Sequence, residues 1–494
     1  MEDNGNKVYV KLQRQPLESE RREIREKRIR TFTLISLFII VLLLGFLGGY
    51  FFRGMSSPSS ISSITKMEEL KYYMENIWLF KDDYEDLDQE LEDRAYYGMT
   101  YFEEDPYTSY MSSSELEEFS SSINMNYVGI GVQYLNEGGI ARVTRVFKGS
   151  PAEKAGVTAG DIILKVDGTE VEGMSSDDIK AMVTGEEGSM VHIDFLRGGE
   201  EIGFDITRGT VDNTAYAYKE NDYVVLEITS FGDGTSSEIY RYLDDYRDVR
   251  KLIIDLRDNG GGYQTAVQEV AGLFLGEDQV VMDQIRNDGT KTTYKTIVEG
   301  DWFDNFEKIV VLTNGNTASA AEVLTICLKE LHPNTTQVGE TTYGKGVVQS
   351  TYLLDEGESA LKVTTSKWLS PKGVWIQDEG IAPDEEVFLD EVMYDAFQPL
   401  SEDQEYHLDS VGAPVATAQK ALSFLDYEVD RKDGYFSAQT ETALKAYQRD
   451  KGFEEDGILD QESYLSIISD LVRSSSQDET KDYQMIKAKE IIEK

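Results

Sequence analysis

Two short segments in the second half of the chain carry the residue types best suited to covalent chemistry. The first is Thr317-Ala318-Ser319-Ala320-Ala321-Glu322, and the second is Gly344-Lys345-Gly346-Val347-Val348-Gln349. A serine hydroxyl is a weak nucleophile at neutral pH and needs a neighbouring group to take its proton. A lysine can act as that base when burial lowers its pKa. The segments therefore predict a Ser319 nucleophile and a Lys345 general base, if folding brings them together.

Ser319 is expected in the first turn of a helix over 318–331. Free backbone N–H groups and the positive end of the helix dipole favour developing negative charge there. Gln349 follows Lys345 by four residues and can orient the lysine amine through a hydrogen bond. Each residue also has a simpler interpretation. A serine at a helix start is commonly an N-cap, and a lysine is commonly a solvated surface charge.

Other catalytic schemes have less support. His332 falls at the far end of the same helix and would point away from Ser319, which disfavours a Ser-His-Asp triad. Cys327 lies on an apolar face of that helix and is interpreted as buried packing. With one cysteine and three scattered histidines, the chain has neither a disulfide framework nor a metal-ligand cluster. No metal or cofactor is predicted.

The residues around these segments predict an α/β core with strands covered by helices. Short apolar runs alternate with helical patterns, the strands expected at 223–228, 251–256 and 308–312 and the helices at 236–248, 264–274 and 318–331.

An earlier region has the pattern of a groove for peptide tails. Gly129, Ile130, Gly131 and Val132 can turn successive backbone N–H groups toward a terminal carboxylate. A helix over 176–183 would flank the groove with Ile179, Met182 and Val183. Ser150, Pro151 and Glu153 form a capping-box pattern at the start of a further helix. A small β-rich domain without a ligand is the alternative.

The N-terminal part predicts a membrane anchor. Residues 1–30 end in a basic cluster, and 31–52 are apolar and uncharged. That length spans a bilayer core of ~30 Å, and the basic flank predicts a cytoplasmic N-terminus. A cleaved signal peptide is the alternative. A flexible Ser/Pro-rich linker is expected at 53–63, and an aromatic-rich helical region at 64–123.

Composition limits the partners and the number of domains. At 494 residues the chain is long enough for several domains. The net charge of −44 disfavours nucleic acid, whose phosphates would be repelled. Residues 409–470 show helical stripes separated by Asp-Gly turns. Residues 471–494 are expected to be a charged tail that is frayed after Ser474.

Several motifs together resemble the carboxyl-terminal processing (tail-specific) proteases, which combine a Ser–Lys dyad with a PDZ domain. The matching stretches are 127–209, 252–262, 314–322 and 342–349. Family members often read Ser-Ala-Ser-Ala-Ser-Glu at the serine segment. Here Thr317 and Ala321 occupy the outer positions, so Ser319 is the only serine left to be the nucleophile.

The resemblance implies further features. It places a PDZ domain at 124–209 and a protease core of crotonase-like spiral fold at 210–400. It implies an oxyanion hole made by the backbone N–H groups of Gly261 and Ala320, and dimerisation through the N-terminal helical region. Residues 409–470 resemble the three-helix peptidoglycan-binding domain of cell-wall enzymes, although a bundle that only packs against the protease is the alternative.

We therefore expect a membrane-anchored, extracytoplasmic serine endopeptidase. It would bind protein substrates by their C-termini through the PDZ domain, and peptidoglycan is a possible further partner. Two other functions remain open at this point: a non-catalytic scaffold with the same binding domains, and a wall hydrolase or transpeptidase acting on peptide crosslinks.

Overall fold

The computed structural model describes residues 58–494, except 126, 212–213, 299–300 and 402. It divides into two compact units, Met1–Gly98 and Met99–Lys494. The apolar segment 31–52 and the basic segment before it lie outside the described residues. Within the described part, no helix combines the length and apolar character needed to cross a membrane.

The first unit is helical where it is described. Its elements are α2 (Pro58–Asn76), the 3-10 turn η1 (Lys81–Asp83) and α3 (Leu87–Thr100), which ends just beyond the unit. The prediction of a flexible linker at 53–63 is wrong for residues 58–63, because α2 already begins at Pro58. Proline suits the first helical turn, since its fixed φ is helical and its missing N–H has no partner to lose there.

The second unit begins with two elements that contact the α/β core. Strand β1 (Ser109–Met111) pairs antiparallel with β18 (Ser359–Leu369). Helix α4 (Ser113–Asn124) follows and starts at a capping box of Ser112 and Glu115. The region expected to be helical over 64–123 thus contains three helices, but it also contributes a strand to a sheet of the core.

The next elements form a small β-rich domain. Its strands and helices are β2 (Tyr127–Gly129), β3 (Val132–Glu137), β4 (Ile140–Val146), α5 (Pro151–Ala155), β5 (Ile162–Val166), β6 (Thr169–Glu170), α6 (Ser176–Val183), β7 (Met190–Arg197), β8 (Glu200–Thr207) and β9 (Gly209–Val211). The expected start of α5 is confirmed, with Ser150 accepting the N–H of Glu153 and Pro151 in the first turn. A core of its own lies between the sheet and α6.

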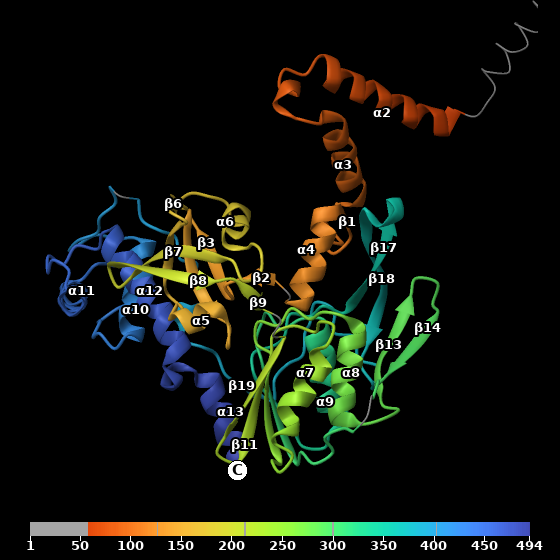
Figure 1. The fold of residues 1–494 in the computed structure, drawn as a ribbon. Helices are drawn as coiled ribbons and strands as arrows, with labels where there is room; N and C mark the ends of the chain where they lie inside the picture. Colours follow the sequence, from red (N-terminus) through yellow and green to blue (C-terminus); the bar gives the residue numbers. More distant parts are fainter. Residues whose placement is uncertain (1–57, 126, 212–213, 299–300, 402) are drawn as a thin grey trace, which may run out of the picture. The chain divides into compact units, whose positions relative to one another are not determined.

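The α/β core is built on a six-stranded sheet of order β10-β11-β12-β15-β16-β19, parallel from β11 onward. The strands are β10 (Ala215–Glu220), β11 (Tyr223–Ile228), β12 (Lys251–Asp255), β15 (Lys308–Thr313), β16 (Thr335–Gly339) and β19 (Glu385–Glu386). Helices α7 (Thr235–Asp244), α8 (Gln264–Leu275) and α9 (Ala320–Leu331) cover one face (Figure 1). The alternation of strands and helices expected from the sequence is therefore present.

The opposite face of this sheet is covered by the last helix of the chain. Side chains that point away from α7–α9 form a second cluster with Ala488 and Ile492 of α13 (Tyr483–Glu493). The prediction that the chain is frayed after Ser474 is therefore wrong, because α12 continues to Gln477 and α13 follows it. Ala488 and Ile492 are four residues apart, on one face of the helix, and both are fully buried on the sheet.

A second sheet of the core follows the order β1-β18-β13-β14, with β17 paired to β18. Its remaining strands are β13 (Val280–Arg286), β14 (Lys291–Lys295) and β17 (Val347–Leu354). Strand β17 begins two residues after Lys345, so this sheet positions the lysine segment.

Helices α10 (Ala413–Phe424), α11 (Ala438–Lys451) and α12 (Gln461–Gln477) surround their own apolar core. Helix α12 packs against the β-rich domain so closely that a Cβ on Gly160 would lie 2.2 Å from the carbonyl oxygen of Ser469. Beside this contact Asp161 is fully buried. It accepts hydrogen bonds from Arg197 and Arg473, the latter at 3.5 Å from α12.

Candidate active site

Ser319 occupies a sharp turn between β15 and α9. Its backbone has φ 56° and ψ −118°, a conformation that non-glycine residues rarely adopt and that is typical of functional turns. The carbonyl of Ser319 accepts the N–H of Val323 at 2.9 Å, and its own N–H donates to a carboxylate oxygen of Glu322 at 2.8 Å. The serine is therefore the N-cap of α9, which begins at Ala320, one residue before the first turn in which the sequence placed it.

A glycine loop, defined here as residues 257–262, follows β12 and lies against this turn. Gly261 has φ 103°, and a Cβ at this position would come within 2.7 Å of the Cβ of Ser319 and 2.9 Å of the backbone nitrogen of Ala320. Only glycine allows this approach. The structure thus brings Gly261, Ser319 and Ala320 together.

The two backbone groups expected to form an oxyanion hole differ in their present partners. Ala320 is the first residue of α9, where an N–H has no acceptor within the helix. The N–H of Gly261 donates to the side-chain oxygen of Asn259 at 2.8 Å. Gly261 must therefore exchange this partner before it can bind an oxyanion.

Lys345 lies in a constrained segment at the start of β17. Its carbonyl accepts a hydrogen bond from the indole N–H of Trp368 at 2.8 Å, and Trp368 is only 1% exposed. The Nζ atom lies 4.6 Å from the ring centroid of Tyr107. Burial lowers the pKa of Lys345, the positive charge of Lys362 lowers it further, and Glu322 opposes both effects. The lysine is therefore partly disposed toward the neutral form that a base requires.

Glu322 connects the serine and lysine segments, a role that sequence reasoning missed. Its side chain is fully buried. One carboxylate oxygen accepts the backbone N–H groups of Ser319 at 2.8 Å and Lys345 at 2.9 Å. The other accepts the hydroxyl of Thr342 at 2.6 Å and the N–H of Gly344 at 2.7 Å. The only signal in the sequence is that Glu322 follows Ser319 by three residues, the spacing of a capping box.

Desolvation raises the pKa of Glu322, and the four hydrogen bonds oppose that effect. Within the described chain, no hydrogen bond joins Nζ of Lys345 to Oγ of Ser319. The two segments are held together through their backbones, while the lysine side chain extends to Tyr107.

Gln349 does not orient Lys345 in this structure. Its side-chain amide donates to the hydroxyl of Thr364 on β18 at 3.1 Å. That hydroxyl donates in turn to Asp105 at 2.9 Å. The bulge between Val348 and Gln349 changes which residues of β17 share a face, and a bulge cannot be predicted from a four-residue spacing.

The predicted tail-binding residues lie together in the β-rich domain but are mostly covered. Ile130, Ile179 and Val183 are buried in its core, with Met182 and Val132 packed at the edge. The carbonyls of Ile130 and Gly131 accept hydrogen bonds from Ala152 at 2.8 Å and Phe147 at 3.1 Å. Gly129 ends β2, where a Cβ would lie 3.8 Å from the side chain of Thr184.

The two residues that the sequence analysis excluded from catalysis have structural roles in α9 and at its end. Cys327 is fully buried in α9, and burial raises the pKa of its thiol. His332 caps the far end of α9, with its ring nitrogens 3.0 Å from the hydroxyl of Thr335 and 3.1 Å from the carbonyl of Phe306. Neither can serve Ser319.

Three domain families match the chain: a PDZ domain over residues 142–197, peptidase family S41 over 222–387, and a putative peptidoglycan binding domain over 411–464. The carboxy-terminal processing protease CtpA of Bacillus subtilis is 32% identical over 474 residues, covering 93% of this chain and 99% of the relative. A probable CtpA-like serine protease of Staphylococcus saprophyticus is 29% identical over 470 residues, covering 94% of each chain.

The chain is thus a serine-type peptidase of family S41, with a PDZ domain and a C-terminal helical domain of the peptidoglycan-binding type. Within that class it belongs to the carboxy-terminal processing proteases. Among solved structures, the photosystem II D1 C-terminal processing protease is 25% identical and covers 67% of this chain and 94% of its own, with a TM-score of 0.42.

Proposed function

We propose that the protein is an endopeptidase in which Ser319 and Lys345 form the catalytic dyad, on a core of the crotonase-like spiral type. The observation that carries this proposal is the Glu322 carboxylate, which holds the backbone N–H groups of both residues at 2.8 and 2.9 Å. A buried carboxylate shared between two segments fixes their spacing, because both sets of bonds must be kept for it to stay satisfied.

In the proposed reaction, Nζ of neutral Lys345 leaves the ring of Tyr107 and accepts the proton of the Ser319 hydroxyl. Oγ attacks the scissile carbonyl carbon, and the N–H groups of Ala320 and Gly261 hold the resulting oxyanion. Lys345 then donates the proton to the departing amine, which leaves an acyl-enzyme on Ser319. Water hydrolyses this ester by the reverse proton transfers.

The direct test uses the full chain in detergent with an unfolded protein that ends in small apolar residues. Ser319→Ala and Lys345→Ala should each abolish cleavage, whereas Ser236→Ala in α7 should cleave as the wild type does. Intact substrate with all four proteins would favour a non-catalytic scaffold. Release of peptides from purified cell wall by both the wild type and Ser319→Ala would favour a wall enzyme.

The PDZ domain is proposed to select substrates by their C-terminal carboxylate. The match over residues 142–197 supports a peptide-binding domain of this kind. Since Ile130, Ile179 and Val183 are buried, tail binding must open the groove, and this change is the proposed trigger that moves Lys345 toward Ser319. A substrate ending in a carboxamide should be cut more slowly than its free acid. Equal rates for the two forms would refute selection by the carboxylate.

We further propose an extracytoplasmic protease held in the cell membrane by residues 31–52, with the C-terminal helical domain binding peptidoglycan. Exposed apolar residues on α2 and directly after it, namely Leu70, Tyr73 and Ile77, support a homodimer through the N-terminal region. Detergent-dependent extraction from membranes, sedimentation with purified sacculi and a dimer mass in detergent are the expected results. Release by high salt, failure to sediment with sacculi, and a monomer mass would each refute the corresponding part.

A further inference from the structure

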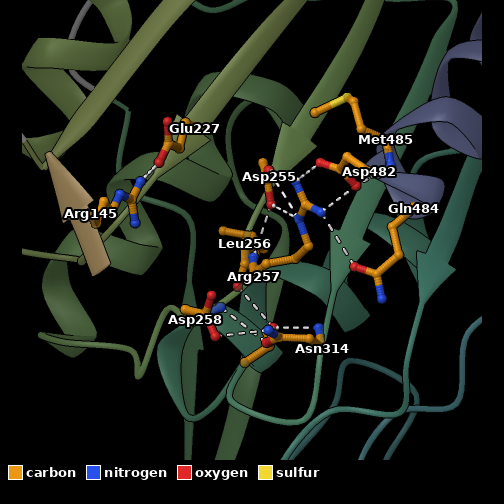
Figure 2. A network of polar contacts seen from close by, with 11 residues as sticks. Arg145, Glu227, Asp255, Leu256, Arg257, Asp258, Asn314, Asp482, Gln484 and Met485 are labelled. Carbon is orange, nitrogen blue, oxygen red and sulfur yellow. Dashed lines mark hydrogen bonds and ion pairs between the residues drawn. The ribbon is translucent and has the colours of Figure 1, made fainter. Parts of the chain in front are cut away.

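Arg257, the first residue of the glycine loop, reaches to the last helix of the chain (Figure 2). Two of its guanidinium nitrogens donate to the two carboxylate oxygens of Asp482 at 2.8 and 2.9 Å. The same guanidinium donates to Asp255 at the end of β12, with a shortest distance of 2.7 Å. Such two-pronged pairs between arginine and carboxylate fix geometry as well as contributing energy.

Asp482 is itself held in place by α13. It is the N-cap of this helix and accepts the N–H of Met485 at 2.9 Å. The helix is anchored on the sheet through Ala488 and Ile492. The neighbouring Gln484 is fully buried and donates to the carbonyl of Val387 at 2.9 Å. Asp482 is therefore a fixed point on the far side of the sheet from α7–α9.

The glycine loop connects the position of Asp482 to that of Ser319 through a series of contacts. The N–H of Asp258 donates to the side chain of Asn314 at 3.0 Å, and the carbonyl of Asn259 accepts the N–H of Ala318 at 2.9 Å. Figure 2 shows Asp258 and Asn314 next to the Arg257 pairs. At the end of the loop, Gly261 lies in contact with Ser319. A shift of Arg257 therefore moves the backbone that faces the reacting carbonyl.

We propose that Asp482 is a positioning residue for proteolysis: by holding Arg257 it holds the glycine loop, so that α13 is a working part of the active site. The role rests on the proposed Ser319 chemistry. Asp482 touches neither substrate nor Ser319, and its effect on the reaction passes through Arg257 and the placement of the Gly261 N–H.

The test compares Asp482→Asn with Lys489→Met in the full chain. Asparagine is also a good N-cap, so Asp482→Asn keeps the start of α13. It removes the charge of residue 482 and leaves the pair of Arg257 with Asp255 in place. Lys489→Met removes another ion pair between α13 and the core, Lys489 with Glu220 at 2.9 Å, which does not involve the glycine loop. It therefore serves as the control for loosening of α13.

We expect Asp482→Asn to lower kcat by roughly 10- to 100-fold, the range for a misplaced oxyanion donor, with KM within about twofold of the wild type. A peptide aldehyde, whose hemiacetal with Ser319 places an oxygen in the oxyanion hole, should lose affinity by a similar factor. The matching peptide alcohol, which forms no such adduct, should bind as before. Lys489→Met should leave all four quantities near the wild-type values.

Three results would overturn the positioning role alone. These are an unchanged kcat in Asp482→Asn, equal losses of kcat in both variants, and failure of Asp482→Asn to fold, which would assign the pair to stability. Cleavage that persists in Ser319→Ala would instead overturn the proposed function, and the positioning role with it.

Discussion

Replacing Glu322 by glutamine tests how the serine and lysine segments are held together. The buried carboxylate has two donors on each oxygen. A glutamine amide has one oxygen and one NH2 group, so its nitrogen must face two donors on one side. The hydroxyl of Thr342 can rotate and accept a hydrogen bond, but a backbone N–H cannot. Glu322→Gln therefore loses at least one and at most two of the four bonds.

The magnitude follows from those bonds. A hydrogen bond to a charged group contributes about 1.5–3 kcal/mol, so the free energy of unfolding should fall by about 2–6 kcal/mol. Because the lost donors lie on the backbone of Ser319, Gly344 or Lys345, part of this loss appears as displacement of the dyad. If roughly half of it does, about 1–3 kcal/mol, kcat/KM falls by roughly 5- to 150-fold, since each 1.36 kcal/mol is tenfold in rate.

Thermal denaturation and cleavage kinetics well below the unfolding midpoint separate the two effects. Glu330→Gln is the matched control, because Glu330 lies on the same helix but does not contact Ser319 or Lys345. Its carboxylate accepts the N–H of Lys372 at a distance of 2.7 Å. It should leave kcat/KM nearly unchanged. A Glu322→Gln protein with kcat/KM within twofold of the wild type would refute the idea that this carboxylate sets the spacing of Ser319 and Lys345.

Other substitutions probe the lysine, the cysteine and the contact between domains. Lys345 must be neutral to act as base, so the rate rises with pH through its pKa. Lys362→Met removes a charge that lowers this pKa and should move the rise in kcat/KM to higher pH; an unmoved pH profile would contradict this. Cys327→Ala should retain activity within about twofold of the wild type. In the wild-type protein, the Cys327 thiol should react with iodoacetamide only after unfolding. Rapid labelling of the folded protein would show that Cys327 is not buried. Asp161→Ala leaves Arg197 and Arg473 without their buried carboxylate and should lower the free energy of unfolding by about 3–5 kcal/mol. Urea denaturation measures this loss, and an unchanged midpoint would argue against this domain contact.

The parts of the fold that were predicted correctly are those with a strong local pattern. The apolar runs at 223–228, 251–256 and 308–312 match β11, β12 and β15 within one residue, because strands buried on both faces read as continuous hydrophobic stretches. The second sheet of the core was not predicted. Its strand β17 has partly exposed residues along its whole length, so neither alternation nor a continuous apolar run identifies it.

The site shows the same division between local and distant information. Ser319 at a helix start and Gly261 beside it agree with what the motifs suggested. Glu322 and Arg257 were visible within those motifs, but their roles depend on partners 20 to 23 and 225 residues away. The fold of the last residues was missed because their charged side chains were interpreted as a solvated tail. Three buried side chains of α13, namely Gln484, Ala488 and Ile492, hold this helix against the core.

The route of the chain has a consequence for biogenesis. Helix α13 follows every strand of the core in the sequence, yet it covers one face of the central sheet and meets the loop beside Ser319. A nascent protein can therefore form its PDZ domain and most of its core while its peptidase remains incompletely assembled. Proteolytic competence should arrive only after α13 has been made, and a chain ended after Gln477 would reveal this by folding of its separate domains without turnover. Such timing would protect other newly made proteins from a half-finished protease.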